Sequence, residues 1–127
     1  MNKIKQFVSA LLATALMTLV VPSALADAAA GKAIYDGKGA CGSCHGPTGN
    51  AEGPVAAALV PKPRSFSEGS FIYDTDGDGQ PGSDTDLFNA IKNGTAKYGG
   101  AATMPARPDI PDSEIQAVVA YIRSLKK

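Results

Sequence analysis

The feature that most constrains this chain is the motif Cys41-Gly42-Ser43-Cys44-His45. It contains both cysteines and the only histidine among the 127 residues. Four kinds of site use two cysteines at this spacing: a thioredoxin-like redox pair, a zinc site, a local disulfide, and the C-x-x-C-H attachment of c-type haem. Each of the four requires different residues elsewhere in the sequence, so the rest of the chain discriminates between them.

The surrounding sequence favours haem. A thioredoxin-like pair belongs to a βαβ unit, and no strand pattern precedes Cys41. A structural zinc site takes four ligands, and no second ligand cluster follows the motif. A disulfide would leave His45 without a role. In the haem interpretation, the thiols of Cys41 and Cys44 form thioethers with the two vinyl groups, and the imidazole of His45 ligates the iron.

The first 26 residues are typical of a cleaved export signal. Lys3 and Lys5 form a basic start, residues 7–21 are almost entirely apolar, and Ala24-Leu25-Ala26 fits an A-x-A cleavage site. The apolar run is shorter than the ~20 residues that span a bilayer, which argues against the alternative of an uncleaved membrane anchor. We therefore expect one mature domain, residues 27–127, outside the cytoplasm and most simply in the periplasm.

Met104 is the candidate for the second axial ligand of the iron. The chain has three methionines, and two of them would be removed with the signal. Met104 would then be the one methionine of the mature chain, whose cysteines and histidine are already assigned to the motif. Met104 follows the motif at a distance that lets a loop carry it to the opposite face of a haem. A thioether opposite an imidazole raises the reduction potential. The alternative is a methionine of the core or surface, with five-coordinate iron.

The hydrophobic pattern predicts an all-α protein with three to four short helices and long loops. The last helix has the clearest pattern, with Asp112 as its cap. Its apolar face repeats at helical spacing and consists of Ile115, Val118, Val119 and Ile122.

The remaining helices are predicted from caps and stops. The first would run from a cap at Asp27 to Tyr35, and residues 55–59 would form a short helical turn. The middle helix would have Asp84 or Thr85 as its cap and would end at Gly94. Because three short helices enclose little core by themselves, a haem would supply the apolar plate around which they pack.

In this order, the motifs resemble those of the class I c-type cytochromes, which are small monohaem electron carriers. The resemblance covers most of the mature chain and rests on Gly31 and Tyr35, Cys41 to Gly46, the proline-rich loop of residues 53–66, Met104-Pro105 and Tyr121-Ile122. It implies the small cytochrome c fold around one covalent haem c, with the first and last helices crossing at close to a right angle. It also implies that Gly31 lets these helices approach near Tyr121.

The resemblance further implies a partner for His45. A proline carbonyl of the 54–63 loop would accept the Nδ1 proton, and we assign it to Pro61. Such a hydrogen bond would orient the imidazole and strengthen its donation to iron.

The stretch of residues 74–86 is acidic and rich in glycine. Asp74, Asp76 and Asp78 fall at positions 1, 3 and 5 of a calcium-loop pattern, with Gly79 at position 6. Position 12 is Thr85 where the pattern has a glutamate, so the match is incomplete. The two interpretations are a solvated loop before the middle helix and a weak Ca²⁺ site, and an acidic docking patch is compatible with either.

The resulting hypothesis is an extracytoplasmic one-electron carrier that meets its redox partners transiently. The formal net charge is zero, which gives no support for binding nucleic acid, and we expect a monomer without a membrane anchor after cleavage. No residue resembles a catalytic acid, base or nucleophile, so we do not expect an enzyme. The alternatives are a cytochrome subunit or electron-entry domain of a larger haem oxidoreductase, and a gas-binding haem sensor.

Overall fold

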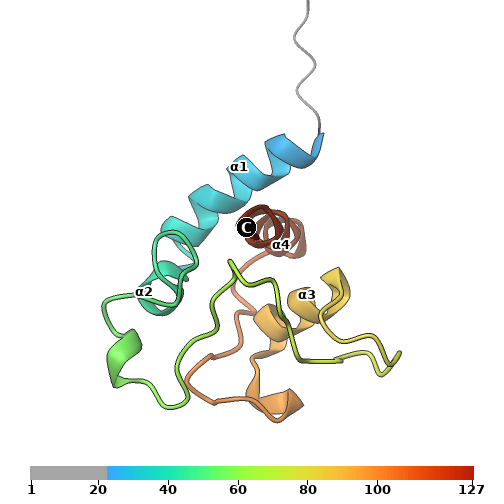
Figure 1. Ribbon diagram of the computed structural model, residues 1–127. Helices are drawn as coiled ribbons and strands as arrows, with labels where there is room; N and C mark the ends of the chain where they lie inside the picture. Colours follow the sequence, from blue (N-terminus) through green and yellow to red (C-terminus); the bar gives the residue numbers. More distant parts are fainter. Residues whose placement is uncertain (1–22) are drawn as a thin grey trace, which may run out of the picture.

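The computed structural model describes residues 23–127, and within that range the protein is helical, with no β-strand. Its elements in chain order are α1 (Ser23–Asp36), α2 (Gly42–His45), the 3₁₀ helix η1 (Ala56–Ala58), α3 (Asp84–Asn93), the 3₁₀ helix η2 (Ala96–Tyr98) and α4 (Asp112–Ser124). Figure 1 shows α4 between α1 and α3, with long loops joining the helices. The predicted all-α fold with short helices and long loops is confirmed.

The main helix contact of the fold is the crossing of α1 and α4. In Figure 1, α4 is seen nearly end-on where α1 runs across it. A Cβ added at Gly31 would lie 1.9 Å from the carbonyl oxygen of Ala117, so the two backbones approach this closely only because residue 31 is glycine. Tyr35 is fully buried, and its ring meets Tyr121 edge-on with the centroids 5.1 Å apart. The expected approach of Gly31 to the last helix near Tyr121 is confirmed.

The first helix begins earlier than predicted. It starts at Ser23, so Asp27 lies inside α1 and the prediction that Asp27 caps the helix is wrong. The residues around Asp27 are mostly alanine, which has the highest helix propensity, and nothing there stops the helix. Of the predicted export signal, residues 1–26, all but the last four residues lie outside the part of the chain that the structure describes.

The last helix has the predicted buried face and a different cap. The side chains of this face are at most 5% exposed: Ile115, Val118, Val119 and Ile122. The N-cap position is held by Pro111, not by Asp112, and no side chain caps the helix. The Pro111 carbonyl accepts the first helical hydrogen bonds, while Asp112 pairs with Lys92 of α3, whose Nζ lies 2.7 Å from its carboxylate. This ion pair occupies the carboxylate that was expected to cap.

The middle helix is capped by Ser83, so the predicted caps Asp84 and Thr85 are wrong by one or two residues. The Ser83 hydroxyl accepts the backbone N–H of Asp86, and the Asp86 carboxylate accepts the backbone N–H of Ser83 in return, which forms a capping box. Asp84 instead pairs with Arg123 of α4. The helix ends before Gly94, as predicted, and Gly94 has a φ of 77° that favours glycine.

No helix between residues 23 and 127 combines the length and apolar character that crossing a membrane requires.

Candidate functional site

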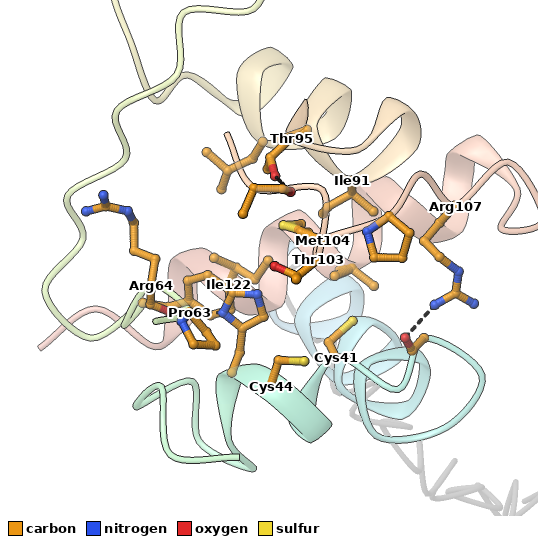
Figure 2. Close-up of a pocket in the computed structure, with 18 of the residues that line it drawn as sticks. Cys41, Cys44, Pro63, Arg64, Ile91, Thr95, Thr103, Met104, Arg107 and Ile122 are labelled. Carbon is orange, nitrogen blue, oxygen red and sulfur yellow. Dashed lines mark hydrogen bonds between the residues drawn. The ribbon is translucent and has the colours of Figure 1, made fainter. Parts of the chain in front are cut away.

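One cavity of about 580 Å³ brings together the residues that the sequence analysis singled out. Its walls come from α2, from residues 59–73, from α3, from residues 101–107 and from α4. Among its lining residues are Cys41, Cys44, His45, Pro61 and Met104. Figure 2 shows Cys41 and Cys44 projecting from one side toward the segment that carries Met104. The cavity has the size of a small-molecule or cofactor site.

The C-x-x-C-H motif adopts a short helical turn, which the sequence analysis did not predict. Within it, the backbone N–H groups of Cys44 and His45 both donate to the carbonyl of Cys41. Cys41 and Cys44 are free thiols that line the cavity together. Burial raises the pKa of the Cys41 thiol. The turn therefore presents two separate sulfur atoms to one space, as thioether attachment to two adjacent groups requires.

The imidazole of His45 is held on one edge and one face. Its Nδ1 donates to the carbonyl oxygen of Arg64 at 2.9 Å, and its ring stacks on Phe66 with the centroids 4.4 Å apart. A carbonyl oxygen can only accept, so Nδ1 carries the proton and Nε2 keeps its lone pair. Burial lowers the pKa of His45 against the opposing effect of the Arg64 carbonyl, which favours the neutral ring. Nε2 is thus prepared to ligate a metal.

The assignment of the Nδ1 acceptor to Pro61 is corrected to Arg64. Pro61 also lines the cavity, but it is exposed, and the hydrogen bond is made three residues later. The reason is the stacking of His45 on Phe66. Because Arg64 precedes Phe66 by two residues, its carbonyl lies beside the imidazole and accepts the Nδ1 proton. The prediction named a proline carbonyl of residues 54–63, whereas the observed acceptor is the carbonyl of an arginine one residue beyond that range.

The loop that carries Met104 is held by hydrogen bonds to Thr95, which follows the end of α3. The backbone N–H of Thr95 donates to the carbonyl of Met104 at 3.3 Å, and the Thr95 hydroxyl donates to the carbonyl of Ala101 at 2.8 Å. Thr95 is only 5% exposed. The Met104 side chain is half-buried and packs against the core cluster at the cavity wall. The loop therefore holds a thioether on the cavity surface, where the proposed axial ligand would be needed.

Arg107 connects this loop to the segment before the cysteines, a contact that the sequence analysis missed. Its guanidinium donates to the carbonyl oxygens of Gly39 at 2.5 Å and Lys38 at 2.8 Å, and it pairs with Asp109. Figure 2 shows the contact to the backbone carbonyl as a dashed line. The hydrogen bonds that Arg107 donates to the Asp109 carboxylate raise the pKa of Arg107, which therefore keeps its charge. A single arginine in a loop carries no pattern that would reveal this contact in advance.

Asp86 is a second residue that the sequence analysis missed. It is 1% exposed and lines the cavity, and its carboxylate accepts hydrogen bonds from the backbone and hydroxyl groups of both Thr75 and Ser83. Burial raises the pKa of Asp86, but these hydrogen bonds outweigh burial and hold the pKa well below its usual range. The spacing Ser83-x-x-Asp86 matches a capping box with Asp at the third position, and this signal could have found the residue.

Because the pKa of Asp86 is lowered in the folded protein, the stability difference between the wild type and a variant without this carboxylate should depend on pH. Above the ordinary Asp pKa of ~3.9, the folded state gains the full stabilisation of the charged group, and this gain is lost as the pH falls through the lower folded pKa. We expect Asp86→Asn to lower the free energy of unfolding by about 1–2 kcal/mol at pH 7, as other lost caps do. In urea titrations between pH 7 and pH 2, the gap to the wild type should shrink below pH ~4. A gap that stays constant over this range contradicts the assignment.

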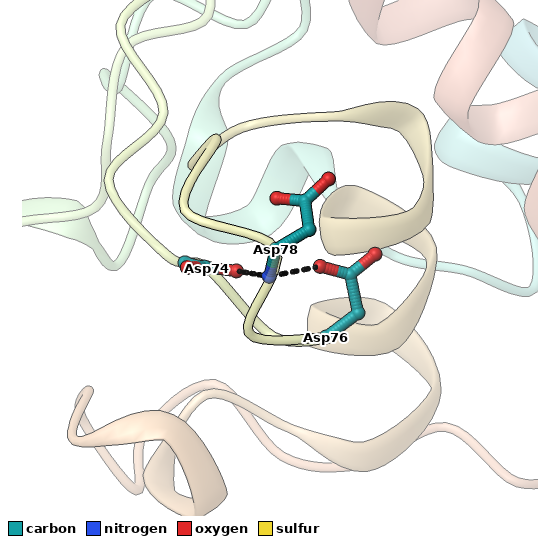
Figure 3. Close-up of side chains that lie close together, drawn as sticks. All are labelled: Asp74, Asp76 and Asp78. Carbon is teal, nitrogen blue, oxygen red and sulfur yellow. Dashed lines mark hydrogen bonds between the residues drawn. The ribbon is translucent and has the colours of Figure 1, made fainter.

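The acidic loop brings its three aspartates together, as the calcium-loop pattern requires. Asp74, Asp76 and Asp78 are exposed, and one carboxylate oxygen of each lies within 4.8 Å of the others. Figure 3 shows the Asp74 and Asp76 carboxylates both accepting the backbone N–H of Asp78. Asp74 also accepts the N–H groups of Gly77 and Gly79. The loop is therefore ordered by its own backbone donors.

Calcium binding by this loop stays a prediction beside the solvated-loop interpretation. Thermal unfolding with added Ca²⁺ and with a chelator distinguishes the two. A melting temperature that rises with Ca²⁺ supports the metal site, and an unchanged melting temperature supports a loop held by hydrogen bonds alone.

The residues around the cavity fit a haem group. The donor set consists of two free thiols on one helical turn, an imidazole whose Nδ1 is already engaged, and a thioether. Cys41 and Cys44 would hold such a group covalently, and His45 and Met104 would supply its axial ligands. Apolar side chains of α3 and α4 complete the wall, among them Leu87, Ile91, Val118 and Ile122.

Comparisons with known proteins agree with this fit. The family profile of cytochrome c matches residues 28–126. Among solved structures, a chain of the reducing HAO-like protein complex of Kuenenia stuttgartiensis matches with a TM-score of 0.62 and 28% sequence identity. The match covers 76% of this chain and 41% of that chain, so the present chain spans less than half of its structural relative. A search of curated proteins gave no match.

Proposed function

The chain belongs to the cytochrome c family, and we propose that it is a one-electron carrier with a single haem c. In this proposal Cys41 and Cys44 form the thioethers, and His45 and Met104 are the axial ligands of the iron. The observation that carries it is the meeting of these four side chains on one cavity. Membership of the family implies a covalently bound haem c and a role in electron transfer.

Each residue of the site has a distinct task. When bound, a haem supplies a one-electron couple whose potential depends on its axial ligands. The turn of Cys41 and Cys44 fixes the edge of the group, and the Arg64 carbonyl orients the His45 ring by holding Nδ1–H. Met104 would supply a thioether ligand to its iron. The apolar side chains of α3 and α4 that line the cavity would exclude water from the bound group.

Met104 also distinguishes a carrier from a haem enzyme or a gas sensor. Those functions need an open axial position, and peroxide chemistry needs an acid-base group beside it. The only histidine of the chain, His45, is already assigned to the iron. A Met104 bound to iron leaves no open position, which favours a carrier.

The second candidate is a cytochrome subunit or electron-entry domain of a larger haem oxidoreductase. It is favoured by one observation, because the matching solved chain is part of a protein complex. Purification from the native host under mild conditions separates the two. A carrier elutes alone as a monomer, whereas a subunit elutes with a fixed stoichiometry of partner chains.

We further propose that the carrier works outside the cytoplasm, in the periplasm, and meets its redox partners transiently. This rests on the signal-like residues 1–26 and on the requirement of electron-transfer partners to separate after each exchange. N-terminal sequencing of the exported protein should begin at Asp27. An intact Met1 contradicts the cleavage.

Two measurements on the purified protein test the proposed function together. The intact mass should exceed that of the mature chain by one haem and should keep this excess under denaturing conditions. A potentiometric titration should show one reversible step that fits a single electron. A haem lost on denaturation contradicts the thioethers, and turnover of a substrate without an electron partner contradicts the role of carrier.

A further inference from the structure

Asp86 is a buried residue on the wall of the cavity, and the proposed function gives its carboxylate no role. It belongs to the first turn of α3 and is 1% exposed. Among the described residues that line the cavity, it is the only one with a carboxylate side chain. The other residues of α3 that line the cavity, Leu87, Ala90 and Ile91, are apolar. The charge therefore lies beside an apolar space and not in solvent.

Neutral groups keep this carboxylate charged without cancelling its charge. One oxygen accepts from the backbone N–H of Thr75 at 2.5 Å and from its hydroxyl at 2.8 Å, and the other accepts from the N–H of Ser83 at 2.9 Å and from its hydroxyl at 2.8 Å. All four donors are uncharged. Hydrogen bonds to the charged form lower the pKa of a carboxyl group, and the pKa of Asp86 lies well below its usual range.

No base pairs with Asp86 among the ion pairs of the described residues. Arg123, the base of α4 at this end of α3, directs its Nε to Asp84 at 2.7 Å and another nitrogen to the carbonyl of Gly82. Of the bases at the cavity, Arg107 is paired with Asp109, Arg64 donates to the carbonyl and hydroxyl oxygens of Ser70, and Lys62 is exposed. The negative charge of Asp86 is therefore available to act on whatever occupies the cavity.

We propose that Asp86 sets the reduction potential of the haem by acting as a fixed buried negative charge on the cavity wall. This inference rests on the proposed function. The oxidised haem iron carries one more positive charge than the reduced iron, so a nearby negative charge stabilises the oxidised form and lowers the potential. Asp86 thus opposes Met104, whose thioether raises the potential.

The test is the midpoint potential of Asp86→Asn in the haem-loaded protein. At a fixed ambient potential, the ratio of reduced to oxidised protein should rise about tenfold relative to the wild type, which corresponds to an upward shift of about 59 mV for one electron. The matched control is Asp84→Asn, which removes the same formal charge two residues earlier from a side chain that is 77% exposed. Because water screens that position, its ratio should change by no more than about twofold.

A second variant separates the charge from the capping box. Ser83→Ala removes the cap and one donor to Asp86 but keeps the carboxylate, so it should lower stability without raising the potential. An upward shift in Asp86→Asn alone supports the proposal. No shift in Asp86→Asn, or an equal upward shift in Ser83→Ala, overturns it and leaves the carrier function intact. A wild-type protein without a reversible one-electron step overturns the proposed function and this inference with it.

Discussion

Replacing Met104 by alanine should lower the reduction potential by on the order of a few tenths of a volt, a large part of the range that axial ligands span. The thioether favours the reduced iron, and Met104 is the methionine that lines the cavity. The variant should also lose the weak near-infrared absorption that arises from a sulfur-iron bond. Potentiometric titration and the near-infrared spectrum of the oxidised protein measure the two effects.

The matched control for this variant is Thr103→Ala. Thr103 precedes Met104 in the same loop and also lines the cavity, but its side chain is exposed. The control should keep the near-infrared absorption and a potential close to that of the wild type. If Met104→Ala retains the absorption, the thioether is not an axial ligand.

The second large effect is expected at Gly31. Gly31→Val should lower the free energy of unfolding by about 3 kcal/mol or more, at the upper end of the cost of overpacking. The reason is that even the Cβ of the new side chain would meet the Ala117 carbonyl at 1.9 Å, and a backbone atom cannot rotate away. Helices α1 and α4 would have to separate, which would also disturb the contact of Tyr35 with Tyr121. Denaturant unfolding of the haem-loaded protein measures the loss.

Ala30→Val provides the control on the preceding residue of α1. Ala30 is exposed, so its replacement carries only the lower helix propensity of valine, less than about 0.7 kcal/mol. Equal losses in both variants would show that helix propensity, and not the crossing, determines the effect at Gly31.

The sequence predicted those parts of the site that depend on neighbours in the chain. Cys41, Cys44 and His45 follow one another closely in the chain, so the motif alone grouped them into one site, and in the structure all three line one cavity. The apolar face of α4 followed from a helical repeat that needs no knowledge of the rest of the fold. Gly94 ended α3 where its positive φ requires a residue without a side chain.

The missed contacts depend on chain segments that lie far apart in sequence. The Arg64 carbonyl reaches His45 because Phe66 stacks on the imidazole, and every residue type offers the same carbonyl. Arg107 reaches Gly39 across 68 positions of sequence. The cap of α3 was missed for a local reason: Asp84 and Thr85 are also good caps, and only the reciprocal hydrogen bonds of Ser83 and Asp86 decide between them.

The most direct test of the central claim is the binding of carbon monoxide to the reduced wild-type protein. If His45 and Met104 occupy both axial positions, carbon monoxide must displace a bound thioether that the loop holds at the cavity wall. We therefore predict no rapid change in the haem spectrum on mixing. Rapid and stoichiometric binding would contradict the account, because it would mean that one side of the iron is open and that the protein is built to bind a ligand there.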